Sequence, residues 1–136
     1  MAEGLIRITP DKAKAKSILN MARTTLEMVR NIDEKRFASN IVKEYYDIMR
    51  QLISAVLVLD GYKTYGEGAH KKAIEYIDKN YKEFSTIEIS VMDELRITRN
   101  KIAYNGFFVR EEYLERKIKM IGNMISKLVN IIETRL

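Results

Sequence analysis

Five side chains within residues 96–104 are of types that could together bind an anion: Arg96, Arg99, Asn100, Lys101 and Tyr104. A guanidinium group can hold a phosphate with two parallel hydrogen bonds, and an amide or hydroxyl group beside it can add a donor or an acceptor. The segment therefore favours a phosphate-binding cluster. An alternative stays open, in which Arg99 makes a structural ion pair and Tyr104 covers the end of a helix.

The spacing of these residues sets how they could act. Arg99 falls at the edge of the expected buried stripe of a helix, with Arg96 one turn earlier and Lys101 on another side. Asn100 and Tyr104, four residues apart, share a face with Arg96. Positions 99 and 104 lie about 140° apart on an ideal helix, so two facing copies could build a site more easily than one copy. A tyrosine at position 104 can donate a hydrogen bond, but it does not transfer protons near neutral pH as an imidazole does.

The remaining candidate groups have ordinary structural explanations. His70 is the one histidine of the chain, and it is expected to open a different helix, where capping or solvent exposure is the usual role. One histidine and no cysteine exclude a histidine or thiolate metal cluster within one subunit, and no cofactor or metal site is expected. Among the other tyrosines, Tyr45 is predicted to lie in the core, and five are predicted to cover the surface: Tyr46, Tyr62, Tyr65, Tyr76 and Tyr81.

The elements that must position these residues are helices. Apolar residues recur at helical spacing in five segments, which predicts an all-α fold, an up-and-down bundle of four to five helices in a single domain over residues 1–136. The expected helices run from about Pro10 to Asn31, Asp33 to Asp60, Ala69 to Asn80, Thr86 to Asn105, and Glu111 to the C-terminus.

Local signals mark several helix ends. Thr9 is predicted to cap the first helix with Pro10 at its first position, and Gly61 to end the second. A capping box formed by Ser85 and Glu88 begins the fourth helix, and Asn105-Gly106 ends it. The stripe expected to be buried on that helix is Val91, Leu95, Thr98 and Ile102.

The charge balance is basic. There are 24 Lys and Arg residues against 19 Asp and Glu residues, which gives a formal charge of +5 and a pI near 9.3. This balance fits a nucleic-acid partner, but it also fits a solvated surface, because the charges are interspersed. The N-terminus carries no long apolar run, and the longest apolar stretch, residues 55–59, is too short to span a bilayer. We therefore expect a cytoplasmic protein with no membrane association.

Three segments resemble the HEPN superfamily of higher eukaryote and prokaryote nucleotide-binding domains. Its signature is an Arg, commonly followed by a polar residue, with a His further along the same helix; Arg99-Asn100 followed by Ile102-Ala103 fits this pattern, and Tyr104 takes the place of the histidine. Residues 42–50 and 57–62 are similar to the long helix of small prokaryotic HEPN proteins, and Ala69-His70-Lys71-Lys72 is similar to the start of their next helix.

The resemblance implies a homodimer in which the motifs of two subunits meet in a cleft and cut RNA without a metal. Arg99 would then stabilise the scissile phosphate, Asn100 would orient it, and Arg96 and Lys101 would add phosphate contacts. Because Tyr104 replaces the histidine, the metal-independent endoribonuclease activity is expected to be weak or lost. The resemblance also implies a toxin–antitoxin context, with a minimal nucleotidyltransferase as the antitoxin partner.

Two alternatives remain at this point. The chain could be a catalytically silent helical module that dimerises and binds a partner protein or a nucleotide, or a structural bundle whose motif is coincidental. Apolar residues outside the main stripe of the last helix, Met120, Met124 and Ile131, favour a homodimer. They could instead pack inside a wide monomer core.

Overall fold

The computed structural model describes residues 4–136, which form five helices and two short strands. In chain order they are β1 (Leu5–Arg7), α1 (Lys12–Val29), α2 (Glu34–Asp60), β2 (Tyr62–Thr64), α3 (Ala69–Asn80), α4 (Thr86–Asn105) and α5 (Glu111–Glu133). The predicted all-α helical bundle is confirmed. None of the helices in this part of the chain combines the length and apolar character that a membrane crossing requires.

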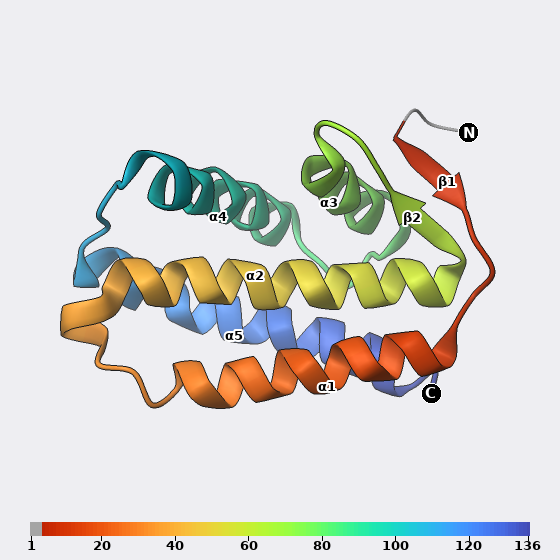
Figure 1. The fold of residues 1–136 in the computed structure, drawn as a ribbon, viewed down its shortest axis with the longest axis horizontal. Coiled ribbons are helices and arrows are strands. Elements are labelled where there is room, and N and C mark those ends of the chain that lie inside the picture. Colours follow the sequence, from red (N-terminus) through yellow and green to blue (C-terminus); the bar gives the residue numbers. More distant parts are fainter. Residues whose placement is uncertain (1–3) are drawn as a thin grey trace.

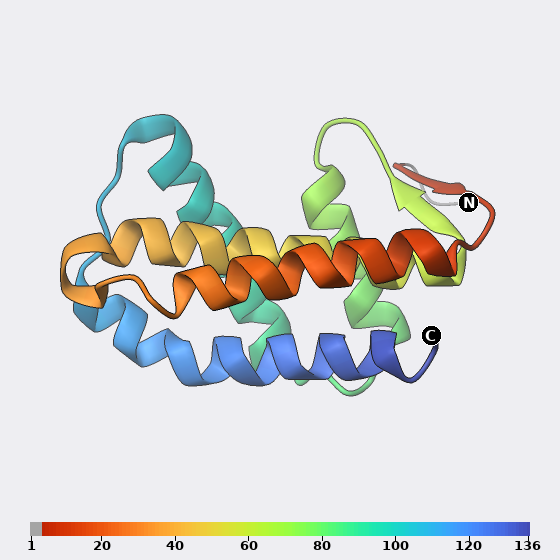
Figure 2. The same ribbon diagram turned by 60° about the horizontal axis from the view of Figure 1, so that its bottom comes forward.

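Helix α2 is the centre of the bundle. Helices α1 and α5 lie along it, while α3 and α4 pack against another side and are inclined to its axis (Figure 1, Figure 2). The predicted stripe of α2 is buried in full: Ile41, Tyr45, Ile48, Leu52, Ala55 and Leu59. Because neighbours surround α2 on several sides, its burial extends beyond one stripe. Tyr46, predicted to cover the surface, is 2% exposed and belongs to the core.

The ends of α2 and α4 follow the local signals in the sequence. Gly61 ends α2 and Gly106 ends α4, both with positive φ angles, which glycine adopts without steric cost. The side chain of Ser85 accepts a hydrogen bond from the backbone N–H of Glu88, and the Glu88 carboxylate accepts one from the Ser85 N–H. The predicted capping box is therefore confirmed.

The start of α1 differs from the prediction. Asp11, not Thr9, is the N-cap, and its carboxylate accepts a hydrogen bond from the N–H of Lys14 at 2.9 Å. The reason lies before the helix, where β1 pairs antiparallel with β2 and the N–H of Ile8 donates to the carbonyl of Gly61 at 2.9 Å. These contacts keep the backbone extended up to residue 8, so the helix begins later. Strands of three residues are too short to show a period-2 pattern in the sequence.

The residues of α5 that favoured a homodimer in the sequence pack inside the single chain. Met124 and Ile131 are buried within the single chain, and Met120 is partly buried against the same core. The alternative that these residues pack inside a wide monomer core is therefore confirmed, and they no longer support a homodimer.

Helix α4 is buried only in its first half. Its buried residues are Glu88, Val91, Met92 and Leu95, whereas Thr98 and Ile102 are only partly buried. The second half of α4 is inclined away from α5 (Figure 2). It carries residues 96–104 and therefore presents them at the surface of the bundle.

Candidate functional site

Arg99 and Tyr104 meet within one chain. The terminal guanidinium nitrogen Nη1 of Arg99 donates to the Tyr104 hydroxyl at 3.5 Å, and the guanidinium carbon lies 5.8 Å from the centre of the Tyr104 ring. The separation of about 140° on the helix does not keep them apart, because both side chains are long enough to bridge it. One copy of the chain is therefore enough to bring these two residues together, and the arrangement of two facing copies stays a prediction.

Arg99 also makes the ion pair that the structural alternative predicts. Its Nε lies 3.3 Å from Oδ1 of Asp47, which α2 supplies, and its side chain is 18% exposed. Burial by itself lowers the pKa of Arg99, but the Tyr104 hydroxyl and the Asp47 charge outweigh it and raise that pKa. Arg99 thus remains charged at every accessible pH. Tyr104 itself is 74% exposed, so its ring does not seal the helix end.

Two more arginines surround the same region. Nε of Arg50, one turn after Asp47 on α2, lies 3.9 Å from Oδ1 of Asp47. Arg96 on α4 pairs with Asp93 at 2.8 Å. We refer to Arg50, Arg96 and Arg99, together with Asp47, as the arginine cluster.

The buried phenol of Tyr46 shows that the members of this cluster lie close together. Burial is the main cause that raises the pKa of Tyr46 to about 12, and the charges of all four cluster residues act on the same phenol.

Several polar atoms of the arginine cluster form ion pairs but no well-aligned hydrogen bond within the described chain. Nε of Arg50, Nε of Arg99 and Oδ1 of Asp47 are buried without a hydrogen bond among residues 4–136. The 3.3 Å ion pair of Arg99 is close but poorly aligned for a hydrogen bond. A buried donor without an acceptor costs about 1–3 kcal/mol. An anionic oxygen bound at the guanidinium groups would accept hydrogen bonds from them in competition with Asp47.

His70, at the start of α3, is brought next to this cluster. Its ring centre lies 6.4 Å from that of Tyr46. Burial, followed by the positive charges of Arg50 and Arg99, lowers the pKa of His70 below its usual range, and Asp47 opposes this in part. The imidazole is thus mostly neutral at pH 7 and can both donate and accept a hydrogen bond.

The other predicted site residues, Asn100 and Lys101, form no ion pair or side-chain hydrogen bond with the arginine cluster among the described residues. Asn100 is partly buried beside Arg99, and Lys101 is exposed with its ammonium group 5.7 Å from the ring centre of Phe107. Lys101 thus points to the loop after α4 and not to Asp47. The structure joins Arg99 with Tyr104 and places Lys101 beside Phe107, at a surface that begins at Tyr104.

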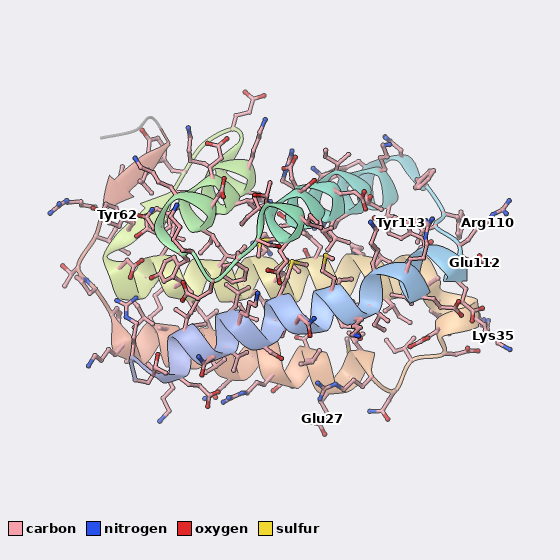
Figure 3. The ribbon with its side chains drawn as sticks, turned by 180° about the vertical axis from the view of Figure 1, so that it is seen from behind. Glu27, Lys35, Tyr62, Arg110, Glu112 and Tyr113 are labelled. Atoms are coloured by element: carbon pink, nitrogen blue, oxygen red, sulfur yellow. The ribbon has the colours of Figure 1, made fainter. Side chains whose placement is uncertain are left out.

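That surface is aromatic. Tyr104, Phe107 and Phe108 are 74%, 47% and 84% exposed, and we call these three residues the aromatic surface. It continues into a hollow lined by Tyr113 and by basic side chains that include Arg110. Figure 3 shows Arg110 and Tyr113 near the start of α5, at the end of the molecule opposite to Tyr62.

Asp47, Arg50 and the proximity of His70 were not predicted from the sequence. One signal could have found the first two. On α2, whose other residues are largely buried, Lys43, Asp47, Arg50 and Ser54 recur at steps of four, three and four, which marks a polar stripe facing a neighbouring element. The approach of His70 has no local signal, because it depends on how α3 packs across α2.

Comparison of the chain with models of protein families, with curated proteins and with solved structures finds no match. A proposal for the function must therefore be argued from the arginine cluster, from His70 and from the aromatic surface.

Proposed function

We propose that this chain is a HEPN-like protein of toxin–antitoxin type that binds RNA or a nucleotide phosphate at the arginine cluster. The observation that carries the proposal is that Arg50 and Arg99 share the single carboxylate of Asp47, with both Nε atoms buried and without a well-aligned hydrogen bond within the described chain. The proposed metal-independent endoribonuclease activity is weak or lost.

The charge balance supports a phosphate ligand. Three guanidinium groups of the cluster face two carboxylates, those of Asp47 and Asp93, so positive charge is left over. A planar guanidinium matches the oxygens of a phosphate in pairs, which an ammonium group cannot do. Arg99 lies between Asp47 of α2 and the exposed Tyr104 and is the expected main contact. Arg96 and Asn100 lie on the same helix and would contact neighbouring groups of the ligand.

The proposed loss of nuclease activity follows from Tyr104. Tyr104 stands where the motif has a histidine, and a phenol does not transfer protons near neutral pH as an imidazole does. The exposed ring of Tyr104 can stack on a nucleobase while Arg99 holds the adjacent phosphate. This division of roles gives binding without efficient cleavage.

We expect Arg99→Ala to weaken RNA binding by about one to two orders of magnitude, because a hydrogen bond to a charged group contributes about 1.5–3 kcal/mol. Arg30→Ala removes an exposed arginine at the end of α1 and is the matched control, with an expected change below about threefold. Fluorescence anisotropy with a labelled single-stranded RNA at fixed salt measures both variants. Equal affinity of Arg99→Ala and wild type would show that the Asp47 ion pair is purely structural.

A second candidate is a catalytically silent dimerisation or protein-interaction module. The aromatic surface favours it, because three neighbouring large aromatic residues exposed to solvent are typical of an interface. The partner would be a second copy of the chain or a minimal nucleotidyltransferase antitoxin.

The homodimer makes a separate prediction. If the aromatic surface pairs two copies, size exclusion with light scattering should give twice the 15.9 kDa of one chain at micromolar concentration. Phe108→Ser should raise the dimer dissociation constant at least tenfold, whereas Ile87→Ser, at another exposed apolar position of α4, should leave it unchanged. A wild-type monomer at several hundred micromolar would remove the dimer from the proposal.

A further inference from the structure

A small cavity adjoins the arginine cluster and shares Arg50 with it. It has a volume of about 210 Å³ and is formed where α1, α2, β2 and the start of α3 come together. Tyr62 lines it, and Figure 3 shows Tyr62 at the end of the molecule opposite to Tyr113 and the loop after α4. Neither Arg99 nor Tyr104 lines it.

The lining of this cavity is basic. Lys14 from α1, Arg50 from α2, Lys63 from β2 and His70 from α3 all contribute, and none of the lining residues is acidic. Among residues 4–136, neither Lys14 nor Lys63 forms an ion pair. Four separate elements thus bring basic side chains to one hollow. Asp47, whose Oδ1 lies 3.9 Å from Nε of Arg50, does not line it.

The Arg50 guanidinium and the start of α3 both add positive charge at this cavity. Nε of Arg50 is buried without a hydrogen bond within the described residues and lies 3.9 Å from Oδ1 of Asp47. Ala69 and His70 begin α3, and the residue before them, Gly68, has no side chain to cap the first turn. The N–H of Ala69 already donates to the carbonyl of Gly66 at 3.3 Å. The positive end of the helix dipole favours an anion at the start of α3, in addition to the side-chain charges.

The size of the cavity limits which ligands can fit inside it. Pockets for drug-sized molecules measure roughly 300–1,000 Å³, and a water molecule takes about 30 Å³. The cavity is too small for a whole nucleotide but large enough for a phosphate group with a few waters. Ser54 and Thr64, which also line it, can add neutral hydroxyl contacts.

We infer that this cavity is a second phosphate-binding site, in which Lys14, Arg50, Lys63 and His70 hold one phosphate group. The inference goes beyond the proposed function, since it does not depend on Arg99. The phosphate group belongs either to a free nucleotide or to the end of an RNA strand, and both sources present the same chemistry to the cavity.

His70 gives a direct readout, because it is the one histidine of the chain and its ring signals in an NMR spectrum are unique. Titration with inorganic phosphate at constant ionic strength should shift these signals saturably, and the His70 pKa should rise when the anion binds. The groups that act on His70 in the free protein are Arg50 and Asp47 of α2 and Arg96 and Arg99 of α4.

The double variant Lys14→Gln/Lys63→Gln should weaken phosphate binding by about tenfold or more, since it removes two charged contacts. The control is Lys16→Gln/Lys79→Gln, which changes the net charge equally at exposed positions that do not line the cavity. Arg99→Ala should keep phosphate binding at His70 within about threefold, even if RNA binding is lost. Failure of the proposed function and failure of this inference are thereby distinguishable.

Binding measurements with three ligands separate a free nucleotide from an RNA end as the source of the phosphate. The ligands are adenosine 5′-monophosphate, a short RNA with a 5′-phosphate and the same RNA without it. Tighter binding of the phosphorylated RNA, by about tenfold and lost in Lys14→Gln/Lys63→Gln, assigns the cavity to an RNA end. Equal binding of the two RNAs, together with saturable binding of the nucleotide, assigns it to a free nucleotide. A His70 signal that responds to phosphate no more than to chloride overturns the inference, and so does a double variant that titrates like wild type.

Discussion

Tyr104→His is expected to raise the rate of RNA cleavage by about 10²–10⁴-fold, the usual contribution of a positioned acid or base. The substitution replaces a phenol that holds its proton at neutral pH with an imidazole whose ordinary pKa is near 6.5. Tyr104 is 74% exposed and its hydroxyl lies 3.5 Å from Arg99, so the exchange costs little packing and puts the imidazole beside the proposed phosphate contact. Cleavage of a labelled single-stranded RNA in the presence of a chelator measures the effect.

Two control variants test whether a gain in cleavage rate comes from the imidazole at position 104 and depends on Arg99. Tyr104→Phe removes only the hydroxyl and should cleave no faster than wild type. Tyr104→His combined with Arg99→Ala should lose most of the gain, because the imidazole would then act on a poorly held phosphate. If Tyr104→His is no faster than Tyr104→Phe, position 104 does not lie at the reacting bond. Efficient cleavage by wild type that survives in Tyr104→Phe would also show that Tyr104 takes no part in the chemistry.

Asp60→Ala is expected to lower the free energy of unfolding by about 3 kcal/mol. Asp60 ends α2, and its carboxylate accepts hydrogen bonds from the hydroxyls of Tyr76 and Tyr81, each at 2.7 Å, and pairs with Arg135. Removing it leaves three partly buried donors without their acceptor. This expected loss of stability lies at the low end for a buried ion pair, because the Arg135 side chain is 37% exposed.

Urea unfolding at pH 7, followed by circular dichroism, measures this loss. Asp78→Ala, at an exposed position of α3, is the matched control and should change stability by less than about 0.5 kcal/mol. Asp60→Asn keeps one acceptor oxygen and should fall between the two. A loss for Asp60→Ala no larger than that of the control would mean that the network contributes nothing.

The same network predicts how stability depends on alkaline pH. Burial first, and then hydrogen bonding to Asp60, raises the pKa of Tyr76 and of Tyr81 above the ordinary value of 10.0. A group with a raised pKa in the folded state contributes stability that is complete below its unfolded pKa and is lost as pH rises above it. Wild type should therefore lose stability above about pH 10. Asp60→Ala should lose less over the same range, because the part of the pKa rise of Tyr76 and Tyr81 that Asp60 causes is absent in this variant.

The sequence by itself determined the helices and most of their ends. The period of apolar residues at 41, 45, 48, 52, 55 and 59 defines α2, and the capping box of Ser85 and Glu88 defines the start of α4. These signals are local, because they depend on residues within one or two turns of each other. For the same reason the sequence identified Arg99 and Tyr104 as neighbouring candidate groups on one helix.

Tertiary packing decided what surrounds those groups. Asp47 and Arg50 meet Arg99 because α4 packs across α2, and His70 joins them because α3 crosses α2 beside α4. The late start of α1 at Asp11 likewise follows from the pairing of β1 with β2, which are more than fifty residues apart in the chain. Such contacts leave no periodic trace in the sequence, since they depend on the angles and faces at which distant elements pack.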